Sequence, residues 1–252
     1  MNSFILKNKS TLLKLKRGFN SIFGIEIVKY PTHELDRRIK LIKSYNIDVI
    51  LDIGANIGQY GSEMRNLGFK GEILSFEPMK NAFKKLQKNA SSDSKWRVFN
   101  FSLGERNGET TINIAKNSVS SSLLDNLPQL IESAPDAEFV EKETIEIKKL
   151  DSIFDSLNLS GKNIYLKIDT QGYEEMVLLG AEKTLDKVTG LQIEMSFIAS
   201  YKGSITFDEM KNKLNLMGFK LLALENGFYD KKTGKQLEVD GVFFNEKKEV
   251  RL

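Results

Sequence analysis

The segment Val49-Ile50-Leu51-Asp52-Ile53-Gly54-Ala55-Asn56-Ile57-Gly58 decides the fold of this chain. Its first half is apolar apart from Asp52, which is typical of a buried strand, and Gly54 and Gly58 indicate a tight turn into a helix. The Gly-x-x-x-Gly spacing differs from the Gly-x-Gly-x-x-Gly of dinucleotide-binding turns and lacks the Gly-Lys-Ser/Thr of a P-loop. We therefore expect glycines that let the backbone approach a ligand without cradling a phosphate.

Outward from this segment, apolar runs alternate with amphipathic helical patterns, as in a parallel sheet covered by helices on both faces. The predicted strands cover residues 48–53, 72–76, 96–101, 163–168, 190–195, 219–224 and 239–244. Turn signals at Asn226-Gly227 and Thr233-Gly234 separate the last two, so we expect these two strands to be adjacent and antiparallel. The predicted fold class is α/β, with a mostly parallel sheet and an antiparallel last strand.

An insertion at about residues 116–142 interrupts this alternation. Two β-rich pieces, 110–115 and 144–150, flank a polar segment that contains several serines and the prolines Pro128 and Pro135. We predict a loop with some helix that lies over the active site as a substrate lid, and a disordered insert is the alternative.

Composition excludes several other kinds of site. The chain has 252 residues, no cysteine and a single histidine, His33. The absence of cysteine rules out disulfides, thiolate catalysis and thiolate metal ligation. A zinc site would need further nitrogen ligands, and a Ser-His-Asp hydrolase would need His33 beside a nucleophile elbow, and the sequence offers neither. The net charge of +3 is too small to imply a nucleic-acid partner, so none is predicted.

The N-terminal residues 1–25 form a basic amphipathic pattern within a predicted helical extension that covers residues 1–40. No acidic residue occurs among them, and helical spacing relates the apolar residues Leu12, Leu15, Phe19, Ile22 and Phe23, while the basic residues are Lys7, Lys9, Lys14, Lys16 and Arg17. No apolar run is long enough for a signal peptide or a membrane span, which predicts a cytoplasmic protein. Peripheral contact at the inner face of a membrane, packing on the catalytic domain and packing in a homo-oligomer all stay open.

A second motif, Ser75-Phe76-Glu77-Pro78, ends the second predicted strand. An acidic side chain in this position accepts hydrogen bonds from both hydroxyls of a ribose. Asp52, at the tip of the first strand, can accept a hydrogen bond from a ligand amino group, and Asn56 can bind a carboxylate or brace the turn. Together the motifs predict a nucleoside-bearing cofactor, unless Glu77 serves only to complement the dipole of the next helix.

With these motifs in place, the chain resembles the FkbM family of methyltransferases. The resemblance is carried by residues 52–58, Phe76-Glu77-Pro78, Leu103-Gly104 and the segment 166–174, and it extends from about Tyr30 to Phe244. It implies a Rossmann-like class I methyltransferase domain at residues 41–252 that uses S-adenosylmethionine. The implied acceptor is a hydroxyl of a sugar, a cell-surface glycan or a secondary metabolite, in the biosynthesis of a surface polysaccharide.

The resemblance also implies which residues hold the cofactor. The methionine portion is assigned to the glycine turn, the ribose to Glu77 with Pro78 beside it, and the adenine to residues 100–103. The assigned residues are Asp52, Gly54, Ala55, Asn56, Gly58, Glu77, Pro78, Ser102 and Leu103.

The predicted catalytic residues follow the fourth and fifth strands. Lys167 and Asp169 alternate with apolar neighbours, so both charges point to the same side of the sheet. Methyl transfer to an alcohol needs alignment of the oxygen and a base for its proton, and Asp169 is the first candidate, with Glu194 the second. Lys167 is assigned to position a carboxylate or to stabilise the developing alkoxide. The alternative is an ion pair of Lys167 with Asp169 or Glu174 that only fixes the turn.

The hydroxyls of Ser120, Ser121 and Ser122 can hydrogen-bond a polyol, which suits a sugar acceptor. The residues assigned to the acceptor are Ser121, Ser122 and Gln171. No metal is predicted, although Asp169 with Glu194 and Asp240 is compatible with Mg²⁺ or Ca²⁺. Two other functions stay open. An NAD-dependent oxidoreductase predicts parallel final strands, and a non-catalytic nucleoside-binding module predicts action through the basic N-terminal helix at a membrane surface.

Overall fold

The computed structural model of the chain describes residues 2–24 and 28–245, with the side chains of residues 2–10 and 12 left out. The chain divides between Arg38 and Ile39 into two compact units. The first contains α1 (Asn2–Phe23), and α2 (His33–Ser44) crosses the division, so the boundary proposed at residue 40 falls inside a helix. Residue 25 and the side chains of Lys7, Lys9 and Leu12 lie outside the described residues. None of the helices described combines the length and hydropathy needed to cross a bilayer.

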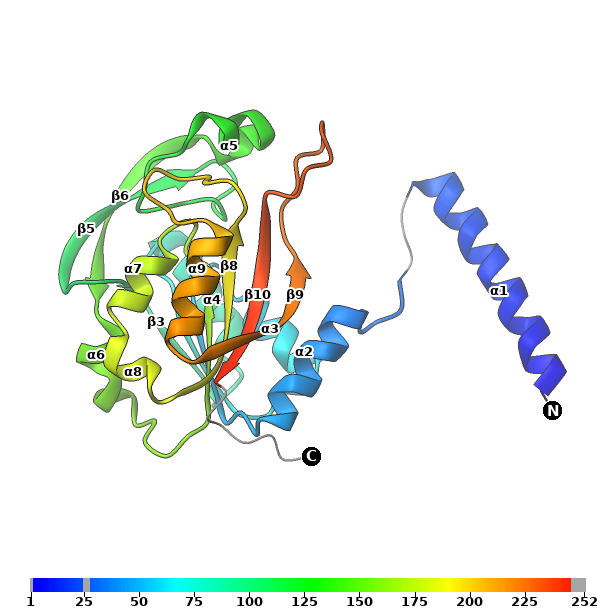
Figure 1. Cartoon of the computed structure of the whole chain (residues 1–252), viewed down its shortest axis with the longest axis horizontal. Helices are drawn as coiled ribbons and strands as arrows, with labels where there is room; N and C mark the ends of the chain where they lie inside the picture. Colours follow the sequence, from blue (N-terminus) through cyan, green and yellow to red (C-terminus); the bar gives the residue numbers. More distant parts are fainter. Residues whose placement is uncertain (1, 25–27, 246–252) are drawn as a thin grey trace. The chain divides into compact units, whose positions relative to one another are not determined.

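A seven-stranded sheet forms the centre of the second unit (Figure 1). The strands are β1 (Val49–Ile53), β2 (Glu72–Phe76), β3 (Trp96–Phe99), β7 (Ile164–Ile168), β8 (Val188–Ser196), β9 (Phe219–Asn226) and β10 (Glu238–Asn245). Their order is β3-β2-β1-β7-β8-β10-β9, and β10 runs antiparallel to both of its neighbours while the other pairs are parallel. The α/β class and the antiparallel last strand are confirmed, and the parallel final strands expected for an NAD oxidoreductase are absent from the described sheet.

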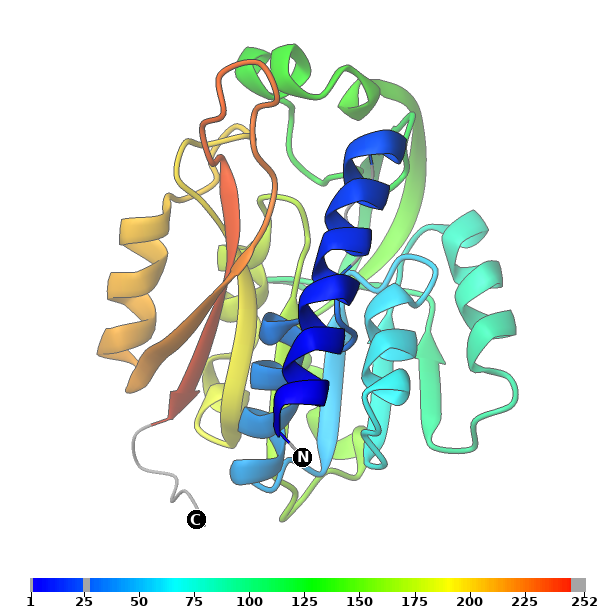
Figure 2. The same ribbon diagram turned by 90° about the vertical axis from the view of Figure 1, so that its right-hand side faces the viewer.

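Helices cover both faces of this sheet, as the two perpendicular views show (Figures 1 and 2). One layer contains α6 (Leu150–Ile153), the 3-10 turn η2 (Phe154–Leu157), α7 (Glu174–Leu179), α8 (Glu182–Leu185) and α9 (Phe207–Leu216). The other contains α3 (Gln59–Asn66), α4 (Lys80–Ala90) and the second half of α2. Leu51 of β1 packs in the first layer and Ile50 in the second, which explains why the central strands are nearly continuous apolar runs.

A separate three-stranded sheet contains β4 (Ser102–Leu103), β5 (Gly108–Ala115) and β6 (Phe139–Lys148), in the order β4-β6-β5. Several predicted strand bounds are wrong here. The third strand ends at Phe99 rather than residue 101, because residues 102–103 pair with β6 instead. Strand β6 begins at Phe139, inside the predicted insertion, because it pairs along the whole of β5. The last residue of the predicted β-rich piece 144–150, Leu150, is instead the first residue of α6.

The rest of the insertion contains two short helical segments. These are α5 (Pro128–Ser133) and the 3-10 turn η1 (Pro135–Ala137). Figure 1 shows α5 at the end of the main sheet toward which β8 points. The prediction of a loop with some helix is therefore confirmed for residues 117–138. The antiparallel pairing of β5 with β6 joins the two ends of the insertion, and the sequence pattern indicates only part of this pairing.

Candidate active site at the carboxyl edge of the sheet

A row of polar side chains crosses the centre of the sheet near the carboxyl ends of its parallel strands. The register aligns Asp52 with Ser75 on one side and with Lys167 on the other, and Lys167 with Gln192. Aligned residues of neighbouring strands share a face, so these side chains all point toward the layer that contains α3. The sheet thus brings together Asp52 and Lys167, which the sequence predicts at two separate sites.

Lys167 is the cation at the centre of this row. Its Nζ lies 3.4 Å from Asp52 Oδ1 and 3.4 Å from Asp169 Oδ2. It also donates a hydrogen bond of 3.3 Å to the carbonyl oxygen of Gly54. Burial lowers the pKa of the Lys167 ammonium, but the charges of Asp169 and Asp52 outweigh burial and hold the pKa above its usual value. Lys167 is therefore a permanent cation that cannot act as a base.

The glycine turn is shaped by its contacts within the protein. Gly54 and Gly58 have φ angles of 78° and 90°, which favour glycine. A Cβ on Gly54 would overlap the carbonyl oxygen of Asp169, and one on Gly58 would lie 2.8 Å from Leu86 Cδ1. These glycines permit close approach between parts of the protein, and their predicted close approach to a ligand stays a prediction. Ala55 is buried in the core layer beside α3.

Glu77 connects the glycine turn to the start of α4. Its Oε2 accepts the backbone N–H of Asn56 at 2.8 Å, and its Oε1 accepts that of Met79 at 2.8 Å. Burial raises the pKa of Glu77 to about 7, more than these two hydrogen bonds lower it. Each carboxylate oxygen can accept a second hydrogen bond, so the side chain retains the capacity to bind ribose hydroxyls. The contact with Met79, the N-cap of α4, shows that Glu77 also supports the helix start.

The residues assigned to the adenine lie in two different surroundings. Asn100 Nδ2 donates to the carbonyl oxygens of Glu77 and Pro78, both at 2.9 Å. Leu103 is fully buried in the core, and the Ser102 hydroxyl donates to the Leu103 carbonyl at 3.3 Å. These contacts do not identify an adenine pocket, so the assignment of Ser102 and Leu103 to the adenine stays a prediction, as does that of Pro78 to the ribose.

Gln171 bridges the two predicted catalytic carboxylates. Its Nε2 donates to Asp169 Oδ1 at 2.9 Å and to Glu194 Oε2 at 2.8 Å. Its Oε1 accepts a hydrogen bond of 2.9 Å from the Tyr201 hydroxyl. Both amide hydrogens are thus used on carboxylates. These contacts place the Gln171 amide between the two carboxylates, and its assignment to the acceptor stays a prediction.

The two carboxylates differ in their surroundings. The Asp169 side chain is 37% exposed and touches the Lys167 ammonium. Burial, followed by the nearby charge of Asp169, raises the pKa of Glu194 well above its usual range. Burial also raises the pKa of Asp240 to about 6. Burial therefore favours the protonated form of Glu194, and Asp169 is the partly exposed carboxylate of the two.

The turn after β7 is held by Glu174. Its Oε1 accepts the backbone N–H of Thr170 at 2.8 Å and that of Gly172 at 3.2 Å. Glu174 therefore fixes the turn through backbone amides. Of the two ion pairs considered for Lys167, the one with Asp169 is present.

The insertion lies against this site. The Ser122 hydroxyl donates to the carbonyl oxygen of Gln171 at 2.7 Å, and the Ser121 hydroxyl accepts the Ala115 N–H at 3.1 Å. Both serines are buried, so each hydroxyl is already used to fix the insertion. Their assignment to the acceptor stays a prediction.

Two site residues were missed at the sequence level, Tyr201 and Gln192. Tyr201 is almost fully buried and its hydroxyl bonds Gln171, and Gln192 accepts a 3.1 Å hydrogen bond from Tyr60 while donating to Asp240 at 2.9 Å. Each had a usable signal. Tyr201 lies in the loop after a parallel strand, where ligands of α/β sheets bind, and Gln192 is a polar residue on the same strand face as Glu194.

No group of three or more histidine, cysteine, aspartate or glutamate side chains in residues 2–24 and 28–245 is arranged to hold a metal ion. Of the carboxylates considered for a metal, Asp169 and Glu194 accept hydrogen bonds from Gln171, and Asp240 accepts one from Gln192.

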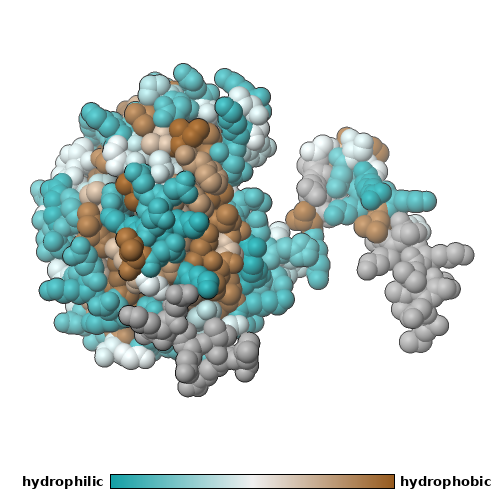
Figure 3. Space-filling model, in the orientation of Figure 1, coloured by the Kyte–Doolittle hydropathy of each residue, from teal (hydrophilic) through white to brown (hydrophobic). Residues whose placement is uncertain are grey.

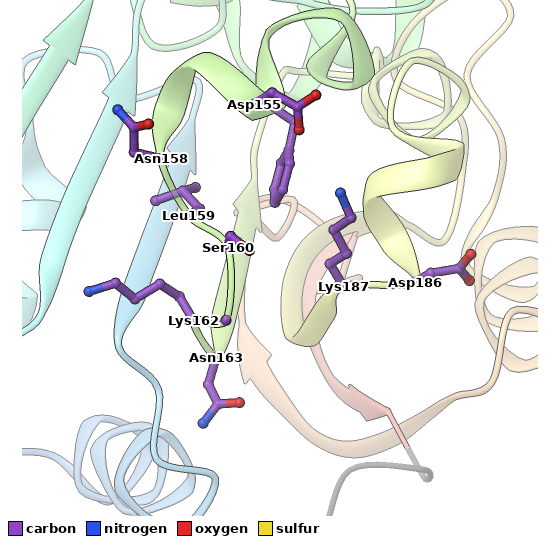
Figure 4. Close-up of a pocket in the computed structure, with 10 residues that line it drawn as sticks. Asp155, Asn158, Leu159, Ser160, Lys162, Asn163, Asp186 and Lys187 are labelled. Carbon is purple, nitrogen blue, oxygen red and sulfur yellow. The ribbon is translucent and has the colours of Figure 1, made fainter.

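A cavity of about 510 Å³ lies at the opposite end of the sheet (Figure 4). Its lining includes Lys162, just before β7, and Lys187, just before β8. Ligands of open α/β sheets bind at the carboxyl ends of the strands, so this cavity is separate from the site described above.

The methyltransferase FkbM domain matches residues 52–221 of the chain, a range that begins at Asp52 and contains Glu77, Lys167 and Asp169. The chain belongs to the FkbM methyltransferase family. A curated relative of this FkbM methyltransferase is the 2-O-methyltransferase NoeI of Sinorhizobium fredii, which is 24% identical over 188 residues, or 71% of this chain and 77% of the relative. The predicted family and the methyltransferase class of enzyme are confirmed.

Among solved structures, the human methyltransferase 10 domain containing protein is 9% identical, with a TM-score of 0.43 over 94% of this chain and 96% of that chain. The METTL16 methyltransferase domain is 9% identical, with a TM-score of 0.46 over 90% of this chain and 75% of that chain. At TM-scores below 0.5 these likenesses decide nothing about the site of this FkbM methyltransferase. The class I arrangement rests on the strand order and on the family match.

Proposed function

We propose that this FkbM methyltransferase transfers a methyl group from S-adenosylmethionine to a hydroxyl of a sugar, a cell-surface glycan or a secondary metabolite. The observation that carries the proposal is the contact of a solvent-facing carboxylate, Asp169, with a buried cation, Lys167, beside the glycine turn. The O-methyltransferase relative supports an oxygen acceptor. A role in the biosynthesis of a surface polysaccharide is the biological setting that we propose.

The residues near the glycine turn fit a nucleoside-bearing methyl donor. Asp52 Oδ1 is fully buried and is paired with the Lys167 ammonium at 3.4 Å without a hydrogen bond between described residues, so it keeps lone pairs for a ligand amino group. Glu77 would hold the ribose through the second lone pair of each oxygen. When bound, S-adenosylmethionine supplies an electrophilic methyl carbon.

The chain's own residues then act on the acceptor hydroxyl. Asp169 accepts its proton, and Lys167 stabilises the negative charge that develops on the oxygen. Glu194, whose protonated form burial favours, donates a hydrogen bond that orients the acceptor. Gln171 keeps the two carboxylates at a fixed spacing. This spacing helps to keep the acceptor oxygen aligned with the methyl carbon, which methyl transfer requires.

Replacing Glu77 with Gln is expected to weaken binding of S-adenosylhomocysteine about ten-fold or more at pH 8, because a hydrogen bond to a charged acceptor is lost. The pKa of Glu77 is about 7, so the wild-type carboxylate is mostly protonated at pH 6 and we expect weaker binding there than at pH 8. Calorimetry at both pH values measures this. Equal affinities for wild type and variant at pH 8 would remove Glu77 from the ribose site.

The same group has a predictable effect on stability. The folded pKa of Glu77 is raised above its usual value of 4.5, so the folded state retains a proton that the unfolded state releases between these values. This contribution to stability is complete below pH 4.5 and is lost as the pH rises through about 7. Glu77→Gln should therefore flatten the pH dependence of the unfolding midpoint in this window, relative to wild type in the same buffers.

Replacing Gln171 with Leu is expected to lower kcat about ten-fold or more and to leave the affinity for S-adenosylhomocysteine unchanged, because Asp169 and Glu194 lose their shared donor. The pH dependence of kcat should also shift, since the two acidic groups then interact directly. Ser122→Ala is the control, as it removes the bonds of the Ser122 hydroxyl to the Gln171 carbonyl and the Leu124 N–H but leaves the Gln171 amide in place. A Gln171→Leu enzyme with wild-type kcat and pH profile would contradict a positioning role.

The acceptor class is tested by incubating the protein with methyl-labelled S-adenosylmethionine and glycan fractions from the source cell. We expect the label on a carbohydrate oxygen, identified by hydrolysis and mass spectrometry. Label found on a nitrogen or a carboxylate, or only in protein, would refute a hydroxyl acceptor.

A further inference from the structure

Helix α1 (Asn2–Phe23) has a composition that the methyl-transfer site does not use. Residues 1–25 contain five lysine or arginine side chains and no aspartate or glutamate. Amphipathic helices of this composition bind at the surface of membranes, and their cationic side chains favour anionic lipids. Because none of the described helices can span a bilayer, surface binding is the arrangement that this composition supports.

Four apolar side chains of α1 share one side of the helix. At 100° per residue, Leu15, Phe19, Ile22 and Phe23 fall within an arc of about 100°. The rings of Phe19 and Phe23 are 4.4 Å apart, which places two aromatic groups side by side on this surface. The exposed fraction is 67% for Leu15, 77% for Ile22 and 61% for Phe23. We call these four residues the apolar stripe.

The basic residues lie where they can reach headgroups when the stripe is buried. By the same helical spacing, Lys16 borders the apolar stripe on one side, and Lys14 lies toward the other. Long lysine stems can extend away from a buried apolar face and keep the ammonium group in water. Space-filling colours show hydrophobic and hydrophilic side chains together on the described part of α1 (Figure 3).

We propose that α1 binds the surface of a membrane rich in anionic lipids, with the apolar stripe among the acyl chains and the lysines among the headgroups. Charge selects this partner over a second copy of the chain. Two α1 helices packed together would bring two sets of unbalanced positive charges close to each other, whereas an anionic bilayer neutralises them. The proposal concerns where the enzyme acts, and it does not depend on the identity of the methyl acceptor.

The test uses the full-length protein and sedimentation with vesicles. We expect at least ten-fold tighter binding to vesicles of phosphatidylglycerol and phosphatidylcholine than to vesicles of phosphatidylcholine alone. Binding should weaken as salt is raised, because exposed charges are screened. Equal binding to both vesicles, or no binding to either, would overturn the proposal.

A matched pair of variants separates the apolar stripe from the helix as a whole. The double variant Ile22→Ser/Phe23→Ser should lose at least ten-fold in vesicle affinity. Leu13→Ser is the control, because Leu13 is also exposed but lies on the side of Arg17, away from the stripe, so its affinity should stay within two-fold. Equal losses in both variants would overturn the stripe assignment. A dimer seen by light scattering that only the double variant disrupts, without vesicle binding by the wild type, would assign the stripe to a second copy instead.

Discussion

Replacing Lys167 with Met is expected to lower the free energy of unfolding by about 3 kcal/mol or more. Asp52 is fully buried, and its Oδ1 lies 3.4 Å from the Lys167 ammonium, so the variant leaves a buried carboxylate without its cation. The carbonyl oxygen of Gly54 also loses a hydrogen-bond donor. Removing one partner of a buried ion pair costs far more than the pair itself contributes, because the remaining charge is not solvated.

Urea unfolding near pH 7.5 measures this effect, and two controls sharpen it. Asp52→Asn combined with Lys167→Met should recover much of the loss, because the variant no longer buries an unpaired charge. Lys162→Met removes an ion pair with Glu72 whose two side chains are 40% and 33% exposed, and it should cost about 1 kcal/mol or less. A Lys167→Met protein as stable as Lys162→Met would show that Asp52 needs no cation.

Replacing Asp169 with Asn is expected to lower kcat by about 10² to 10⁴, the usual contribution of a general base. The amide cannot accept the acceptor's proton, although its oxygen can still face Lys167 and keep the turn. Binding of S-adenosylhomocysteine should stay within about two-fold, because the cofactor is assigned to the glycine turn and Glu77. The combination of slow transfer and normal cofactor binding identifies a catalytic role.

Single-turnover methyl transfer and calorimetry supply the two measurements. Asp240→Asn is the matched control, because Asp240 belongs to the same polar region but accepts its hydrogen bond from Gln192. We expect Asp240→Asn to change kcat by less than about three-fold, since it is not the proposed base. Full activity of the Asp169→Asn enzyme would show that another group is the base.

The central strands could be predicted from the sequence because they are buried on both faces. Ile50 and Leu51 contact opposite core layers, so the segment is apolar at nearly every position and has the length of a strand. The polar residues at the strand tips were also visible, because Asp52, Glu77 and Asp169 each interrupt or end an apolar run. Strand ends in the second sheet were less predictable, since residues 102–103 are strand only through pairing with β6, far along the chain.

Some features of the site residues could likewise be predicted from the sequence, and others depend on the tertiary structure. Sequence spacing indicates that Lys167 and Asp169 share a face, but the register with β1 is what places Lys167 between Asp52 and Asp169. The role of Gln171 had no sequence signal of its own. Its amide reaches Glu194 and Tyr201, which are distant in the chain, through a turn in which Gln171 has a φ of 56°.

The sequence by itself determined the order of the main-sheet strands along the chain, the glycine turn, the carboxylates at the strand tips and the family. These follow from local periodicity and from residue types that are confined to a short stretch of chain. Tertiary structure alone decided which charges are paired, which carboxylate has a pKa raised by burial and which amide joins the two carboxylates. Such properties depend on burial and on distances of a few ångströms between segments, and no spacing along the chain contains that information.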